Sequence, residues 1–267
     1  MPLEPQSELI LPPDGTTLWR YIDLAKFLLL LETRSLWFSR ADQFEDPLEG
    51  TLTDAEMEHL RSRDVANPDR QWSFFEGLLR ATRHMRATAY VSCWRADEDE
   101  SMAMWGLYGK GGVTVAVKTT VGNLKQAISE SPLRVFLGEV KYLDWRSAYS
   151  DNSPLGMCFR KDTSYEYEKE VRAVIWDADR VSRNASDALK AARKLGDYSK
   201  AVPDPFLLQK TDGDRGIEVP IDPVNFVTEV VVGPRETESI FRLVKSLLDR
   251  YGIGIKITAS NRLTPRP

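Results

Sequence analysis

The sequence predicts a single α+β domain built around a mixed, strongly twisted β-sheet with helices packed on it. Strand-like runs of β-branched and aromatic residues outnumber the helical patterns. Several successive runs also have no helical stretch between them, whereas a doubly wound parallel sheet needs helical crossovers. The 267 residues are enough for one large core. Residues 1–16, which contain four prolines, are expected to form a flexible leader, and residues 17–267 the domain.

Local signals give the order of the elements. Asp23 is expected to cap a helix from Leu24, because a carboxylate at this position accepts a hydrogen bond from the first turn. Thr53 and Glu56 have the spacing of a capping box. Helices are predicted over residues 24–33, from 53 onward, and over 68–86, 101–108, 121–129, 186–195 and 236–251. Strands are predicted over 18–21, 35–39, 88–94, 113–118, 135–142, 171–176, 229–232 and 254–258, with 143–165 and 197–215 irregular. The helices at 24–33 and 236–251 are expected to lie on the sheet.

Composition excludes several classes of protein. The net charge is -4, and no basic tail or block is present, which argues against non-specific binding of nucleic acid. The longest apolar run, residues 27–31, is too short to span a bilayer. Cys93 and Cys158 are the two cysteines, which favours a reducing compartment, so a cytoplasmic protein is expected. His59 and His84 lie at no metal-ligand spacing, and no metal is expected.

The charged segment from Glu166 to Arg172 is the most informative part of the chain. If it is extended, its three glutamates share one face with Arg172, because side chains alternate along a strand. Like charges so placed repel, so a cationic partner is expected opposite them. If the segment is helical, Glu166 and Glu170 still repel at one turn's spacing. The simpler alternative is a solvated charged run that leads into a core strand.

Several short motifs together resemble the bacterial domain-of-unknown-function family 2971. They are the strand Leu18-Trp19-Arg20-Tyr21, the loop from Phe44 to Glu49, Ser92-Cys93-Trp94, the Met-Trp-x-x-Tyr pattern of residues 104–108, and the Glu-x-Glu-x-Arg of residues 168–172. The resemblance covers roughly residues 18–260. Glu45 stands where the family usually has Asn. The family name assigns no activity.

The order of Arg20, Ser92 and the pair Glu168 and Glu170 is also similar to that of Arg-Ser-Glu class ADP-ribosyltransferases. This resemblance implies a split sheet and NAD as substrate. It implies that Arg20 holds the phosphates and ribose of NAD and that Ser92 supports the nicotinamide-side pocket. Glu170, with Glu168, would bond the ribose. A fixed carboxylate stabilises an oxocarbenium-like centre, and an arginine recognises diphosphate.

An aromatic side chain, Trp105 or Tyr108, can stack on the nicotinamide ring. The implied function is NAD-dependent ADP-ribosyl transfer or NAD glycohydrolysis, in a bacterial toxin or phage-defence effector. The partners would be a small-molecule nucleotide and a protein or nucleic-acid acceptor, with no membrane. We expect the six site residues in one cleft, with Arg20 and Glu170 on the same side of the sheet.

Other interpretations remain open. Arg20 can be a stacked or salt-bridged surface arginine, and Trp105 and Tyr108 can belong to the core. Glu139 and Lys141 match half of a metal-dependent nuclease site, but that chemistry also needs an upstream aspartate, which is missing nearby. A cytosolic sensor or binding module without enzyme activity is the remaining alternative.

Overall fold

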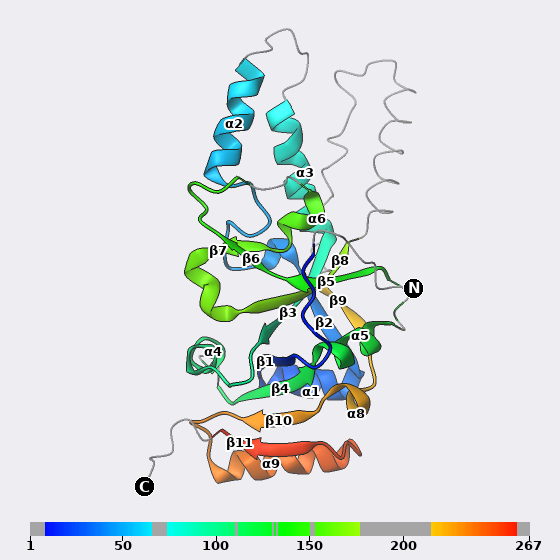
Figure 1. Cartoon of the computed structure of the whole chain (residues 1–267). Helices are drawn as coiled ribbons and strands as arrows, with labels where there is room; N and C mark the ends of the chain where they lie inside the picture. The colour runs from blue at the N-terminus through cyan, green and yellow to red at the C-terminus, as the bar shows by residue number, and fades with distance from the viewer. Residues whose placement is uncertain are drawn as a thin grey trace.

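The structure is a computed structural model that describes residues 9–65, 74–109, 112–129, 131, 133–149, 153–176 and 215–260. It contains a nine-stranded sheet in the order β11-β10-β4-β1-β3-β2-β9, with β8 paired to β3 and β5 paired to β8. Figure 1 shows α2 and α3 at one end of the molecule and α9 at the other. The sheet is mixed, since β10 and β11 are parallel and the other pairs are antiparallel. The predicted α+β class is confirmed.

The strands of the large sheet are β1 (Thr17–Asp23), β2 (Ser35–Arg40), β3 (Ala89–Ala96), β4 (Thr114–Thr120), β5 (Val135–Glu139), β8 (Glu170–Trp176), β9 (Gly216–Pro220), β10 (Glu229–Val232) and β11 (Lys256–Ala259). A small parallel pair is formed by β6 (Lys141–Leu143) and β7 (Arg160–Asp162). The helices are α1 (Leu24–Thr33), α2 (Asp54–Val65), α3 (Phe74–Thr88), α4 (Met102–Tyr108), α5 (Val121–Ser129), α6 (Pro154–Met157), α8 (Pro223–Phe226) and α9 (Glu238–Arg250). The described residues also contain two short 3-10 helices, η1 (Ala41–Gln43) and η3 (Thr163–Glu168).

The sheet divides at β3. Residues 18–19 of β1 pair with residues 95–96 of β3, whereas residues 39–40 of β2 pair with residues 90–91. Both β1 and β2 pair with the edge of β3 that does not face β8, one at each end of β3. The two strands therefore diverge from each other along this edge. Among the described strands, none pairs with residues 92–94 on that edge. We call this opening the β1–β2 gap.

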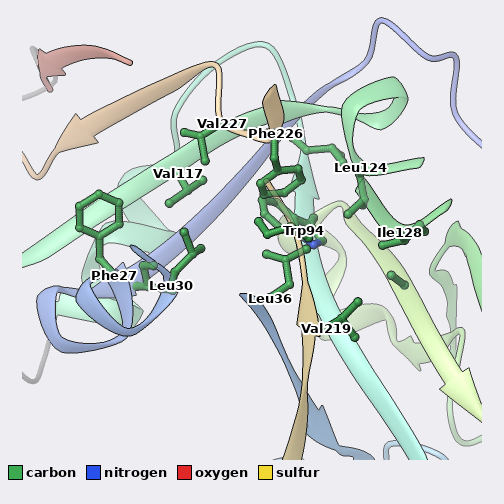
Figure 2. Close-up of a cluster of buried hydrophobic side chains, with 14 of the residues drawn as sticks. Phe27, Leu30, Leu36, Trp94, Val117, Leu124, Ile128, Val219, Phe226 and Val227 are labelled. Carbon is green, nitrogen blue, oxygen red and sulfur yellow. The ribbon is translucent and has the colours of Figure 1, made fainter. Parts of the chain in front are cut away.

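One face of the sheet, which we call the α1 face, carries the larger core. Phe27 and Leu30 of α1 pack there with Trp94 and Val117, as Figure 2 shows. The rings of Trp94 and Phe226 meet edge to face at 5.5 Å between centroids. The two helices expected on the sheet, α1 and α9, both contribute buried residues to this core. That expectation is confirmed.

The opposite face, which we call the α3 face, carries a second core. Met85 of α3 and Leu155 of α6 pack there with Val91 of β3 and Val174 of β8. Tyr90 and Ile175, the sequence neighbours of these two valines, belong to the first core. The two cores are therefore the two sides of the same strands, which supports a single domain.

The local signals for helix ends are confirmed. The Asp23 carboxylate accepts a hydrogen bond from the Lys26 amide at 2.8 Å, and α1 begins at Leu24. In the capping box, the Thr53 amide donates to Glu56 at 2.8 Å and the Glu56 amide donates to Thr53 at 3.2 Å. These bonds satisfy backbone donors that the first turn of a helix leaves without partners.

Two expectations are wrong, and two features of the fold were left open or not predicted. Residues 143–165 are not irregular, since they contain β7, α6 and the start of η3. Residues 9–16 are not a loose leader, because the Glu139 amide donates to Ile10 at 2.8 Å and the Gly122 amide to Asp14 at 2.8 Å. Of the two alternatives left open for residues 166–172, the extended one holds only from Glu170, where β8 begins, because residues 166–168 belong to the 3-10 helix η3. The strand at residues 216–220, which closes the β2 edge, was not predicted.

Two predicted segments, the helix at 186–195 and nearly all of the loop at 197–215, lie outside the described residues, as do residues 1–8 of the leader. Within the described residues, none of the helices has the length and apolar character needed to span a membrane.

Candidate functional site

Arg20 lies at the β1–β2 gap. Its guanidinium donates to the Ser92 hydroxyl of β3 at 2.9 Å and to the Trp37 carbonyl of β2 at 2.9 Å. It also lies 5.5 Å from the ring centroid of Trp94. The Trp37 carbonyl is available because residues alternate along the antiparallel ladder of β2 and β9. The even-numbered Arg34 and Arg40 hydrogen-bond to the chain at the two ends of β9, so the odd-numbered Trp37 presents its backbone to the other edge. Arg20 thus spans the gap from β1 to β2.

The positive charge of Arg20 has no acidic partner among the described residues. No ion pair joins it to a carboxylate there, and its hydrogen bonds go to neutral oxygens. Burial lowers the pKa of Arg20, while Cys93 and Tyr108 act to raise it. A desolvated guanidinium bonded only to neutral groups still has unused donors, because an arginine carries five N–H groups. The geometry suits an anion at this position.

A second group of charged side chains lies nearby on the α3 face. The Lys161 ammonium contacts Glu168 at 2.7 Å, Glu49 at 2.9 Å and Glu170 at 3.8 Å. Arg172 contacts Glu170 at 2.7 Å and Glu49 at 3.1 Å. We call these five residues the charge cluster. All are largely buried, and three carboxylates face two cations, which leaves one negative charge in excess.

The two carboxylates of the Glu-x-Glu motif differ in their electrostatics. Burial alone would raise the pKa of Glu170, but Arg172 and Lys161 outweigh burial and hold the pKa below its usual range. Burial raises the pKa of Glu168 even though Lys161 opposes it. The thiol of Cys93 hydrogen-bonds to Glu170, and burial together with that carboxylate raises the thiol pKa well above its ordinary value. Glu170 is therefore a fixed anion, and Glu168 is the more basic of the pair.

Arg20 and Glu170 do not share one side of the sheet, so that expectation is wrong. Trp19 lies opposite Arg95 in the β1–β3 ladder, and Arg95 lies opposite Glu170 in the β3–β8 ladder. Directly paired residues point to the same face, and neighbours along a strand point to opposite faces. Glu170 therefore lies on the α3 face, and the Cα–Cβ bond of Arg20 points to the α1 face.

β3 connects the two groups nevertheless. Ser92 binds Arg20, and Cys93, the next residue, hydrogen-bonds to Glu170. Arg20 also interacts electrostatically with Cys93, which acts to raise the pKa of the guanidinium. The predicted residues form two adjacent groups that meet at this gap.

The two aromatic residues of the predicted site, Tyr108 and Trp105, lie in different environments. Tyr108 is 46% exposed, and its pKa is raised, first by burial of the hydroxyl and then by Cys93, Glu170 and Glu168. It stays with the site. Trp105 is 5% exposed, and its indole nitrogen donates to Glu100 at 2.8 Å.

The Trp105 ring also meets Tyr21 edge to face, with 4.9 Å between the centroids. Trp105 belongs to a small core on the α3 face of β1 and β4, as the alternative interpretation had it. Its proposed contact with nicotinamide is therefore wrong.

Sequence reasoning did not identify three members of the site, namely Lys161, Glu49 and Cys93. The repulsion within the Glu-x-Glu segment did predict a cationic partner, which Lys161 and Arg172 supply. Lys161 comes from β7, a strand of three residues in a stretch without periodicity. Glu49 lies in a family-like loop, and that was the only signal for it.

No group of three metal-ligating side chains occurs in the part of the chain that the structure describes. The nuclease alternative gains no support there, since Glu139 ends β5 and Lys141 is an exposed residue of β6. No known protein family matches the chain, and no curated protein matches it either. The resemblances therefore remain predictions.

Proposed function

We propose that the chain binds NAD at the β1–β2 gap and breaks its nicotinamide glycosidic bond, by ADP-ribosyl transfer or by hydrolysis. The observation that carries this proposal is Arg20, a desolvated guanidinium at the β1–β2 gap whose hydrogen bonds within the described residues go to neutral oxygens. It would bind the diphosphate through its remaining N–H donors.

Charge complementarity supports this choice of ligand. The diphosphate of NAD is anionic, whereas its oxidised nicotinamide ring is cationic. Arg20 offers a positive charge to the first, and the charge cluster, with its excess negative charge, faces the second. Tyr108 provides an exposed aromatic ring beside the cluster.

In the proposed reaction, the bond between the nicotinamide nitrogen and the ribose C1′ breaks, and its electron pair leaves with nicotinamide. Glu170, held as an anion by Arg172, stabilises the positive charge that develops on the ribose. A water molecule or an acceptor then bonds to C1′. The raised pKa of Glu168 suits it to take the proton of this nucleophile, which passes on to solvent.

A second candidate is a module that binds a nucleotide without turning it over. The burial of Glu170 against Arg172 favours it, because a carboxylate that is fully paired within the fold can be structural. The placement of Arg20 and Glu170 on opposite faces favours it too. Both candidates require the anion site at Arg20, so a binding experiment tests them together. An assay for nicotinamide release then distinguishes the enzyme from the binding module.

The first experiment measures binding of NAD, NADH and ADP-ribose by calorimetry. NAD should bind about fivefold more tightly than NADH, since its ring carries one more positive charge next to the cluster. Arg20→Gln should weaken binding by about tenfold to a hundredfold. Arg242→Gln is the control, because Arg242 is an exposed arginine that pairs with Glu238 of the same helix. No detectable binding of any of the three ligands would rule out both candidates.

The second experiment incubates the protein with NAD and detects free nicotinamide by chromatography. Release that Arg20→Gln abolishes and Arg242→Gln leaves intact supports the enzyme. Binding without release supports the module. An acceptor is then sought by following label from NAD into protein or nucleic acid.

A further inference from the structure

We propose that Lys161 is the positioning residue of this site, which holds the Glu168 and Glu170 carboxylates together on one ammonium. The proposal rests on the proposed function for its catalytic meaning. Its electrostatic content can be measured without turnover. Among the described residues, Lys161 contacts three carboxylates: Glu168 at 2.7 Å, Glu49 at 2.9 Å and Glu170 at 3.8 Å.

The backbone explains why such a cation is required. The 3-10 turn η3 ends at Glu168, and Lys169 then adopts a left-handed conformation with φ 44° before β8 begins at Glu170. The turn therefore brings two carboxylates to one cation instead of separating them. Without Lys161 they would repel each other in a region that water scarcely reaches.

Arg172 does not provide this function for both glutamates. It bonds to Glu170 and Glu49 and makes no ion pair with Glu168 among the described residues. Lys161 alone connects the outer carboxylate, Glu168, to the inner one, Glu170. Its removal would change the cluster from one excess negative charge to two.

The described groups that interact with the ammonium are charged or aromatic. They include Glu49 from the loop before α2, Tyr165, Tyr167 and Glu168 from η3, Glu170 from β8, and Tyr108 from α4. Tyr165 lies with its ring centroid 4.5 Å from the ammonium. A neutral side chain at position 161 leaves the carboxylates with Arg172 as their single cation.

The test titrates the glutamate side chains by NMR in protein labelled with carbon-13 at the glutamate carboxyl groups. Signals are assigned by Glu168→Gln and Glu170→Gln. In Lys161→Met, the pKa of Glu168 should move up, because an opposite charge is lost while Glu49 and Glu170 remain. Lys161→Arg should restore it. Lys256→Met is the control, since Lys256 is an exposed lysine of β11 that pairs with Glu229 of β10, at one end of the strand order.

A Glu168 titration that is the same in Lys161→Met and in wild type overturns the proposal, whatever the activity. If Lys161→Met does not fold, Lys161→Gln serves as the second neutral variant. Loss of the ammonium should again raise the pKa of Glu168, and an unchanged or lowered pKa would contradict the proposal equally.

Turnover is the separate readout. Misplacement of a reacting group costs about a hundredfold in rate, so nicotinamide release should fall by about that factor in Lys161→Met, recover in Lys161→Arg and show little change in KM. A wild-type protein that releases no nicotinamide refutes the proposed function but leaves the NMR result to decide the role of Lys161. A shifted Glu168 with unchanged turnover refutes the positioning role alone.

Discussion

Glu170→Gln and Arg172→Met should lower the free energy of unfolding by different amounts, although both substitutions break the same 2.7 Å ion pair between Arg172 and Glu170. Glu170→Gln removes one of three carboxylates and leaves two against the two cations. Arg172 keeps Glu49 at 3.1 Å, and the new amide oxygen can still accept a hydrogen bond. We expect a loss of about 1.5–3 kcal/mol, that of a hydrogen bond to a charged group.

Arg172→Met has the larger effect. It leaves three buried carboxylates with Lys161 as their single cation, and it also removes the donor to the Cys158 carbonyl at 2.7 Å. Breaking a buried pair so that a charge is uncompensated costs about 3–5 kcal/mol. Methionine fills much of the arginine's space, so the difference reflects charge more than packing.

Urea unfolding followed by tryptophan fluorescence measures both losses. Equal costs for the two variants would refute the charge count on which the reasoning rests. The pH adds a check on the sign. The folded-state pKa of Glu170 lies below its unfolded value, so its contribution is present above the unfolded pKa and disappears as the pH falls through the folded pKa. The difference in unfolding free energy between wild type and Glu170→Gln should therefore disappear at acidic pH.

Activity separates the two roles of Glu170. If it stabilises charge only in the transition state, the folded Glu170→Gln protein should lose about a hundredfold to a thousandfold in nicotinamide release with NAD affinity little changed. Glu166→Gln is the matched control, since Glu166 is exposed. A folded Glu170→Gln protein with wild-type turnover would leave Glu170 a structural role only.

Two further predictions concern the backbone. Lys169→Gly should stabilise the protein by about 0.5–1 kcal/mol, because a non-glycine residue at the left-handed φ of 44° is strained by more than its ion pair with Asp97 contributes. Loss of the Lys169 ammonium should also raise the Asp97 pKa from about 2, as NMR titration would show. Gly216→Ala should destabilise by about 1–3 kcal/mol, since its new methyl group would meet the Trp37 ring and the neighbouring β2 backbone. Gly77→Ala, which has open space in α3, should stabilise by about 0.5–1 kcal/mol; thermal unfolding that gave both alanines the same sign would contradict this account.

The parts of the fold that the sequence predicted are those specified locally. Asp23 and the Thr53–Glu56 box determine helix starts within a few residues, so their effects do not depend on the tertiary structure. The repulsion among the glutamates of residues 166–170 is also local, and it predicted a cation correctly. The identity of that cation was not predictable, because Lys161 reaches Glu49 across more than a hundred residues of chain.

The faces of the sheet could not be predicted in the same way. Arg20 and Glu170 are related through two ladders, β1 with β3 and β3 with β8. A shift of one residue in either register would move one of them to the other face. Trp105 and Tyr108 show a similar limit within α4. Their spacing of three suggests a shared side, yet Trp105 is buried and Tyr108 is half exposed, because the underlying strand β1 covers only part of the helix.

The distribution of charge around β3 is the strongest reason to regard the site as functional. A solvent-poor guanidinium that pairs with no carboxylate among the described residues, and a buried cluster with one carboxylate in excess, are each unfavourable alone. Here they are neighbours, joined through Ser92 on one face and Cys93 on the other. A purely structural solution would pair Arg20 directly with a glutamate. The strand instead keeps the opposite charges apart at the β1–β2 gap, where a ligand that carries both an anionic and a cationic group can compensate both at once.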